Sequence, residues 1–80
     1  MQHRHMDTPL RRIRLARERT LTEVAAAIGC DKGNLSRLER GKIPATPPLA
    51  ARLAKYFEPD ISELEILYPE RYAESDEARA

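Results

Sequence analysis

The chain has 80 residues and a mass of 9.1 kDa, which is the size of one small domain. Hydrophobic residues make up 41% of it, too many for a disordered tail. The single cysteine, Cys30, excludes an intramolecular disulfide framework and a multi-cysteine zinc site, and it indicates a reducing compartment. No apolar run approaches the roughly 20 residues that cross a bilayer. The first twenty residues are rich in arginine, which excludes a signal peptide, so we expect a soluble cytoplasmic protein without membrane contact.

The charges are divided unevenly along the chain although the net charge is only +1. Residues 1–42 carry ten basic and five acidic side chains, whereas residues 43–80 carry four basic and eight acidic ones. A basic half is typical of a surface that meets an anion, and an acidic half of one that keeps the protein soluble or meets another partner. On charge alone, ordinary surface variation explains the difference equally well.

Capping signals predict the first two helices. Thr8-Pro9 combines an N-cap with proline at the first helical position, and apolar Leu10 then opens a short helix with a basic outer side. Thr20 followed by Glu23 predicts a capping box. The second helix starts there and ends at Gly29, a residue typical of helix C-termini.

A third helix follows after a turn of about three residues. Asp31 offers its N-cap, Leu35 and Leu38 form a buried stripe, and Gly41 ends it. Two short helices joined by the turn Gly29-Cys30-Asp31 form a helix-turn-helix.

Two more helices complete an all-α, compact five-helix domain. Thr46 and the two prolines after it start the fourth, whose predicted inward residues are Leu49, Leu53, Ala54 and Phe57. A capping box of Asp60 and Glu63 starts the fifth, with Ile61 inside it. We expect a flexible N-terminus over residues 1–7, a folded domain over 8–68, and a disordered acidic tail over 69–80.

The third helix carries the functional interpretation. Its buried leucines leave Lys32, Arg37 and Arg40 pointing elsewhere, with Asn34 near the edge. Lysine and arginine donors match the O6 and N7 atoms of guanine, and asparagine matches adenine. A glycine inside a helix costs about 1 kcal/mol relative to alanine. Gly33 either permits close approach of the backbone to DNA or is merely tolerated near the helix start.

Residues 10–68 resemble the helix-turn-helix family of lambdoid phage repressors and Cro proteins, also called XRE-like regulators. The most specific part of the resemblance is the run Leu-Ser-Arg-Leu-Glu-Arg-Gly at residues 35–41. The other matching residues are Leu10, Ile13, Arg14, Thr20, Glu23, Val24, Ala25, Ile28, Gly29 and the segment 60–64. The resemblance implies a lambda-repressor-like fold and DNA binding.

The resemblance also implies roles for individual residues. Lys32, Gly33 and Arg37 fall where the family places base-reading residues, and Asn34 and Arg40 where it more often places phosphate contacts. Arg14 and Glu39 match a buried structural ion pair between the first and third helices.

The chain departs from the family at two places. Leu21 stands where many members have a phosphate-binding glutamine. Glu18 and Arg19 replace a glycine and an apolar residue before the second cap, which makes Arg19 a candidate phosphate contact.

Other kinds of site have little support in the sequence. We expect Cys30 to be a buried structural thiol rather than a redox switch. His3 and His5 lack further metal ligands, so we expect no metal site and no cofactor or small-molecule ligand. No catalytic constellation or glycine-rich phosphate loop is present, so we expect no enzymatic activity.

We therefore predict a sequence-specific transcriptional regulator, a phage- or prophage-type repressor that binds double-stranded DNA as a homodimer on an inverted repeat. The predicted base contacts are Lys32 and Arg37, assisted by Asn34 and Gly33, and the predicted phosphate contacts are Arg11, Arg12, Arg19, Arg40 and Lys42. The fifth helix region is the candidate dimer surface, formed by Ile61, Leu64, Ile66, Leu67 and Tyr68. The alternative is a protein-interaction module such as an antitoxin or adaptor.

Overall fold

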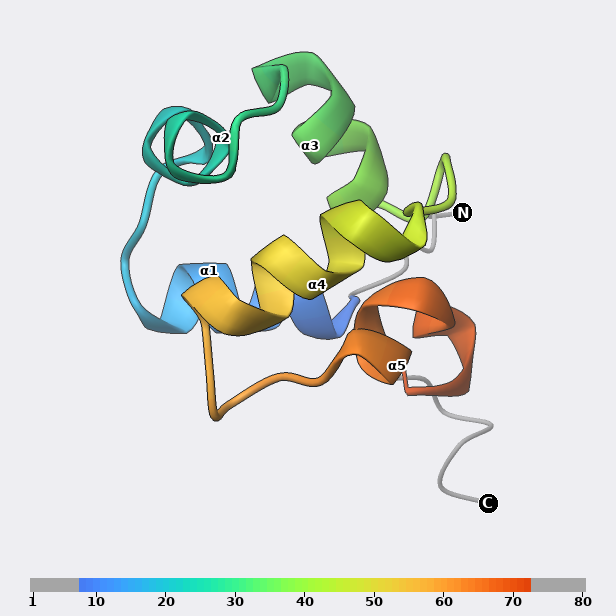
Figure 1. Ribbon diagram of the computed structural model, residues 1–80. Helices are drawn as coiled ribbons and strands as arrows, with labels where there is room; N and C mark the ends of the chain where they lie inside the picture. The colour runs from blue at the N-terminus through green and yellow to red at the C-terminus, as the bar shows by residue number, and fades with distance from the viewer. Residues whose placement is uncertain (1–7, 73–80) are drawn as a thin grey trace, which may run out of the picture.

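The computed structural model describes residues 8–72, which form five α-helices and one short 3-10 helix, with no strand in that range (Figure 1). The elements are α1 (Pro9–Ala16), α2 (Leu21–Ile28), α3 (Lys32–Glu39), α4 (Pro47–Tyr56), α5 (Glu63–Leu67) and the 3-10 helix η1 (Pro69–Arg71). The prediction of a compact all-α domain with a helix-turn-helix at α2 and α3 is confirmed. No helix among the described residues is both long and apolar enough to span a membrane.

The described structure continues past residue 68, where the sequence led us to expect its end. Pro69 opens η1 because its fixed φ suits the first position of a turn, and the Tyr72 N–H closes this turn on the Pro69 carbonyl at 3.0 Å. The expectation of a disordered tail is therefore wrong for residues 69–72. Residues 73–80 and the expected flexible segment 1–7, which contains His3 and His5, lie outside the described residues.

Each α-helix starts at a side-chain N-cap, which accepts a hydrogen bond from the backbone N–H three residues later. The caps are Thr8, Thr20, Asp31, Thr46 and Ser62. The capping box of α5 is Ser62 with Glu65, so the predicted box at residues 60–63 is wrong. The shift places Ile61 just before the cap and Ile66 at the fourth helical position, the two positions of a hydrophobic staple, and both are buried in the core.

One apolar core holds the helices together. Its fully buried members include Val24 of α2, Leu35 of α3, Leu53 of α4, and Phe57 at the end of α4. Burying such a side chain contributes roughly 1.5–3 kcal/mol. The predicted inward face of α4 is corrected in part, because Ala50 is also fully buried whereas the predicted Leu49 and Ala54 are only half-buried.

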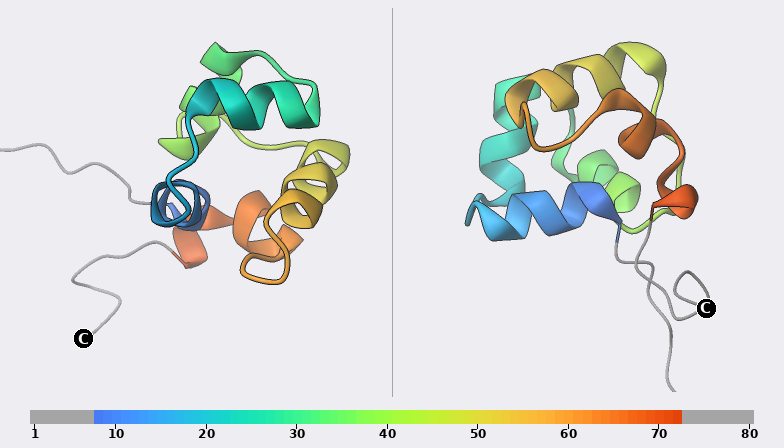
Figure 2. Two further views of the ribbon diagram at one scale, coloured as in Figure 1. Left: turned by 90° about the vertical axis from the view of Figure 1, so that its left-hand side faces the viewer. Right: turned by 90° about the horizontal axis from the view of Figure 1, so that it is seen from below.

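The arrangement of the helices exposes α3. Helix α4 packs against both α2 and α5, and α1 packs against α5 (Figures 1 and 2). The Arg17 guanidinium, at the C-terminus of α1, donates to the Phe57 carbonyl at 3.0 Å and to Asp60 Oδ2 at 2.6 Å. These bonds fix α1 to the turn after α4. Helices α1, α4 and α5 therefore form a layer against which the α2–α3 pair packs.

Candidate nucleic-acid interface

Helix α3 has one buried face and one exposed polar face. Leu35 and Leu38 are 0% and 6% exposed, and they anchor the helix in the core. Lys32, Asn34 and Arg37 are exposed on the remaining surface. The predicted base-reading side chains therefore lie together on the outside of a helix whose position is set by apolar packing.

Both ends of α3 are fixed by local hydrogen bonds. The Asp31 carboxylate accepts from the Asn34 N–H at 3.2 Å. At the C-terminus, Gly41 adopts a φ of 72°, which allows the N–H groups of Gly41 and Lys42 to bond the carbonyls of Leu38 and Arg37. This pair of hydrogen bonds forms a Schellman motif, which requires the left-handed conformation that glycine adopts without strain.

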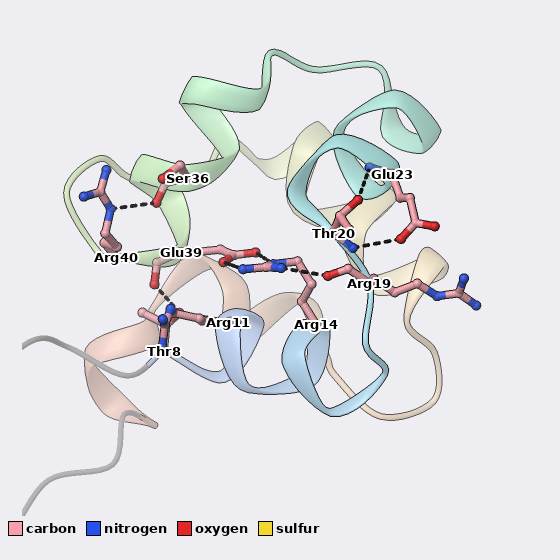
Figure 3. A network of polar contacts seen from close by, with 9 residues as sticks. All are labelled: Thr8, Arg11, Arg14, Arg19, Thr20, Glu23, Ser36, Glu39 and Arg40. Atoms are coloured by element: carbon pink, nitrogen blue, oxygen red, sulfur yellow. Dashed lines mark hydrogen bonds and ion pairs between the residues drawn. The ribbon is translucent and has the colours of Figure 1, made fainter.

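Helix α2 is oriented by a complete capping box. The Thr20 hydroxyl accepts from the Glu23 N–H at 3.0 Å, and the Glu23 carboxylate accepts from the Thr20 N–H at 2.8 Å (Figure 3). The box places an acidic group at the helix start, where a phosphate would otherwise be favoured. Leu21, which replaces the family's glutamine, is half-buried against the core.

Arg14 and Glu39 form a buried ion pair between α1 and α3, at the positions where the resemblance predicts one. Arg14 Nε lies 2.5 Å from Glu39 Oε2, and Arg14 Nη2 lies 2.9 Å from Oε1, so the guanidinium is bidentate on the carboxylate (Figure 3). The two residues are only 9% and 2% exposed. Arg14 Nη1 also donates to the Arg19 carbonyl at 2.7 Å, which positions the segment that leads into α2.

The residues before α2 form a turn at some conformational cost. Glu18 adopts a φ of 54°, the left-handed region where glycine is favoured. The N–H groups of Glu18 and Arg19 bond the carbonyls of Leu15 and Arg14, so α1 also ends in a Schellman motif. The Arg19 side chain is exposed and extends away from the ion pair (Figure 3).

The other predicted phosphate contacts differ in their surroundings. Arg11, Arg40 and Lys42 are exposed. Arg40 Nε donates to the Ser36 carbonyl at 3.3 Å, along the surface of α3. Arg12 is half-buried and donates from Nη2 to the Tyr72 carbonyl at 3.2 Å, so it also holds the C-terminal turn against α1.

The candidate dimer residues divide between core and surface. Ile61 and Ile66 are each 5% exposed and belong to the core, so the prediction that they supply an intermolecular contact is wrong. Leu67 is half-buried against the core. Leu64 and Tyr68 remain exposed, and the Arg71 guanidinium lies 5.0 Å from the centre of the Tyr68 ring.

The Cys30 thiol is partly buried at the turn between α2 and α3, rather than enclosed as the sequence led us to expect. Burial raises the pKa of Cys30, the charge of Asp31 raises it further, and the charge of Arg52 partly lowers it. Its Sγ donates a weak hydrogen bond to the Asp31 carbonyl at 3.6 Å. A thiol with a raised pKa is a poor nucleophile near neutral pH.

Sequence reasoning missed two contacts that shape this interface. The Thr8 hydroxyl, predicted only as a cap, also donates to the Glu39 carbonyl at 2.6 Å (Figure 3). Arg37 Nη2 donates to Asn34 Oδ1 at 2.7 Å. The second contact had a signal, because residues three apart on a helix are neighbours, whereas the first joins residues 31 positions apart.

In a comparison with protein families, residues 9–66 match the helix-turn-helix domain. No curated protein and no solved structure matches the chain. The matched range contains α1 to α4 and nearly all of α5, including the complete α2–α3 pair. The match agrees with the resemblance to XRE-like and Cro-type regulators. Such domains typically bind DNA and are not enzymes. The chain belongs to the helix-turn-helix domain family of DNA-binding proteins.

Proposed function

We propose that this protein is a sequence-specific transcriptional regulator of the phage- or prophage-repressor type, which binds an inverted-repeat operator as a homodimer. The observation that carries the proposal is the exposed face of α3. Lys32, Asn34 and Arg37 offer hydrogen-bond donors on a helix that is capped at both ends and anchored by buried leucines. A rigid helix with such side chains suits the major groove, which is about 12 Å wide.

Phosphate contacts would supply most of the affinity. Arg19 precedes α2, and Arg40 and Lys42 follow α3, so exposed cations flank the helix-turn-helix pair. Arg11 and Arg12 of α1 add positive charge, although Arg12 also binds the Tyr72 carbonyl. Contacts of this kind position a protein on the duplex without reading its sequence.

A two-fold dimer would double the number of base contacts and would match operator symmetry with protein symmetry. The exposed residues Leu64 and Tyr68 support the α5 region as the dimer surface, with half-buried Leu67 beside them. The buried residues Ile61 and Ile66 have no part in this surface.

Selection of bound sequences from random DNA tests the proposal, because it yields the site, its symmetry and the half-site spacing together. Arg37→Ala and Arg40→Ala then form a matched pair, since each removes one exposed arginine from the same helix end. We expect Arg37→Ala to lose about 1–3 kcal/mol and to relax preference at one base position. Arg40→Ala should weaken binding to all sequences alike.

The salt dependence of binding separates this function from the protein-interaction alternative. For a DNA-binding regulator, the logarithm of the binding constant falls with the logarithm of salt concentration, at a slope of about −0.9 per neutralised phosphate. An antitoxin or adaptor that uses an apolar surface would show almost no such slope toward its partner. Failure to enrich any sequence would contradict the proposal.

A further inference from the structure

We infer that Asn34 is a positioning residue for Arg37 rather than a base-reading residue, and that Gly33 provides the space in which the Arg37 guanidinium lies. This assignment rests on the proposed function. It implies that the base pair of the half-site that faces this part of α3 is a G·C pair, whose guanine Arg37 reads.

The contact between Asn34 and Arg37 uses the same oxygen that Asn34 would need to read a base. Arg37 Nη2 donates to Asn34 Oδ1 at 2.7 Å, and both side chains are exposed. An asparagine that reads adenine uses its oxygen to accept from N6 and its amide to donate to N7. The oxygen has a second lone pair, but the bond from Arg37 sets the orientation of the amide, so a paired contact with adenine would compete with that bond.

Arg37 loses little by making this contact. Its guanidinium carries five N–H groups, and the bond to Asn34 uses one of them. Two of the remaining groups suffice for the paired contact with O6 and N7 of guanine. Holding the side chain in place beforehand lowers the entropic cost of ordering it on binding.

The surroundings of Gly33 show where the guanidinium lies. A Cβ atom at position 33 would stand 3.7 Å from both Nη1 and Nη2 of Arg37, and 3.0 Å from Asp31 Oδ2. The arginine therefore folds back over the first turn of α3, in the direction that helical side chains favour. The Asp31 carboxylate, which accepts from the Asn34 N–H, borders the same position.

These contacts give a physical reason for a glycine at a helical position. The φ of Gly33 lies outside the left-handed region, so the backbone conformation does not require a glycine there. A methyl group there would lie at ordinary van der Waals distance from the guanidinium but only 3.0 Å from Asp31 Oδ2, which is a tight contact. A longer side chain would occupy the place of the guanidinium. The bare position thus leaves room for the Asp31 carboxylate that caps the helix and for the Arg37 guanidinium beside it.

A double-mutant cycle on the full chain tests the assignment, with binding measured to the selected duplex and to duplexes that differ at single base pairs. We expect Asn34→Ala to weaken binding about three- to tenfold, the cost of ordering one long side chain, without changing preference at any adenine. In the Arg37→Ala background the same substitution should change binding less than twofold, because Asn34 acts through Arg37. Circular dichroism controls for folding.

A second variant and a second measurement separate positioning from base reading. Asn34→Asp keeps an oxygen acceptor for Arg37 but removes the amide donor, so the guanine preference at the Arg37 step should survive even if added charge lowers overall affinity. In the free protein, ¹⁵N relaxation at Arg37 Nε should show a side chain that becomes more mobile in Asn34→Ala and stays ordered in Asn34→Asp.

Two results would overturn the inference while leaving the proposed function intact. One is an equal effect of Asn34→Ala with and without Arg37. The other is loss of an adenine preference in either Asn34 variant. A wild-type protein that prefers no duplex would overturn the proposed function and this assignment with it.

Discussion

The hydroxyl of Thr8 donates a hydrogen bond to the backbone carbonyl of Glu39 across 2.6 Å, and so joins the first turn of α1 to the last turn of α3. The same oxygen accepts from the Arg11 N–H at 3.2 Å, so one atom both caps α1 and satisfies a carbonyl at the end of α3. Thr8 is only 1% exposed. Water cannot readily replace the bond to Glu39, because that bond is buried.

Replacing Thr8 by valine keeps the shape of the side chain and removes both hydrogen bonds. We expect Thr8→Val to lower the free energy of unfolding by about 1–3 kcal/mol, because it leaves a buried carbonyl and a helix N–H unsatisfied. Urea unfolding followed by circular dichroism measures the loss. Thr8→Ser, which keeps the hydroxyl, should lose clearly less; equal losses would mean that packing alone makes this residue stabilising.

Removing one partner of the Arg14–Glu39 pair should be far more costly than removing both. Arg14→Met leaves a buried carboxylate without its counter-ion and should cost about 3–5 kcal/mol in unfolding free energy. The double variant Arg14→Met/Glu39→Leu should recover most of that stability, since it buries no uncompensated charge. Denaturant midpoints of the two variants decide the matter, and a double variant no more stable than the single one would contradict this account.

The left-handed conformation of Glu18 offers a route to a more stable protein. A non-glycine residue in this region destabilises the folded state by about 1–2 kcal/mol. Replacing it with glycine removes this strain, but glycine also raises the entropy of the unfolded chain, which offsets part of the gain. Glu18→Gly should therefore raise the unfolding free energy by about 1 kcal/mol, observed as a higher urea midpoint. Glu18→Ala removes the same charge but keeps Cβ, and we expect no comparable gain from it.

Cys30 should react slowly in the folded protein. Burial, and after it the charge of Asp31, raises the pKa of the thiol above its ordinary value of 9.0, so folding favours the protonated form. The stability linked to this shift is fully present below pH 9.0 and is lost as the pH rises through the folded-state value.

Alkylation by iodoacetamide at pH 8.5 checks the direction of this shift. We expect a slower reaction in the native protein than in the urea-unfolded chain. Asp31→Asn, which can still cap α3, should speed the native reaction by lowering the pKa. A native rate above the unfolded rate would point instead to an activated, redox-sensitive cysteine.

Two exposed leucines give a matched test of the dimer surface. Leu64 is 53% exposed on α5 and Leu15 is 48% exposed on α1. We expect Leu64→Asp to abolish dimerisation in sedimentation experiments while the helical circular dichroism spectrum is retained. Leu15→Asp should leave the dimer intact, and loss of dimer in this control alone would move the interface to α1.

Sequence patterns predicted the helices because the relevant signals are local. An N-cap and its partner lie three residues apart, so Thr20 and Glu23 can be recognised without any tertiary information. The start of α5 was ambiguous, since Asp60 with Glu63 and Ser62 with Glu65 have the same spacing. Burial of Ile61 in the core selects the second pair, and burial depends on the whole fold.

The candidate site was only partly predictable for the same reason. The side-chain types on α3 and their exposure follow from the helical period and from the buried leucines. The bond between Arg37 and Asn34 depends on rotamers, and the space over Gly33 depends on where the arginine turns. The bond from Thr8 to Glu39 joins helices far apart in the chain, and no spacing rule indicates it.

The guanidinium of Arg14 connects α1, the end of α3 and the segment before α2, so we expect these three parts to unfold locally as one unit. If α1 detached, Glu39 would lose its counter-ion and the Arg19 carbonyl would lose its hydrogen-bond donor. Helix α3 and the segment that leads into α2 would then loosen together. Amide hydrogen exchange should then proceed from all three regions at a common rate. A fragment reduced to the α2–α3 pair would be a poor scaffold, because it would lack α1, which holds α3 and the start of α2 in position.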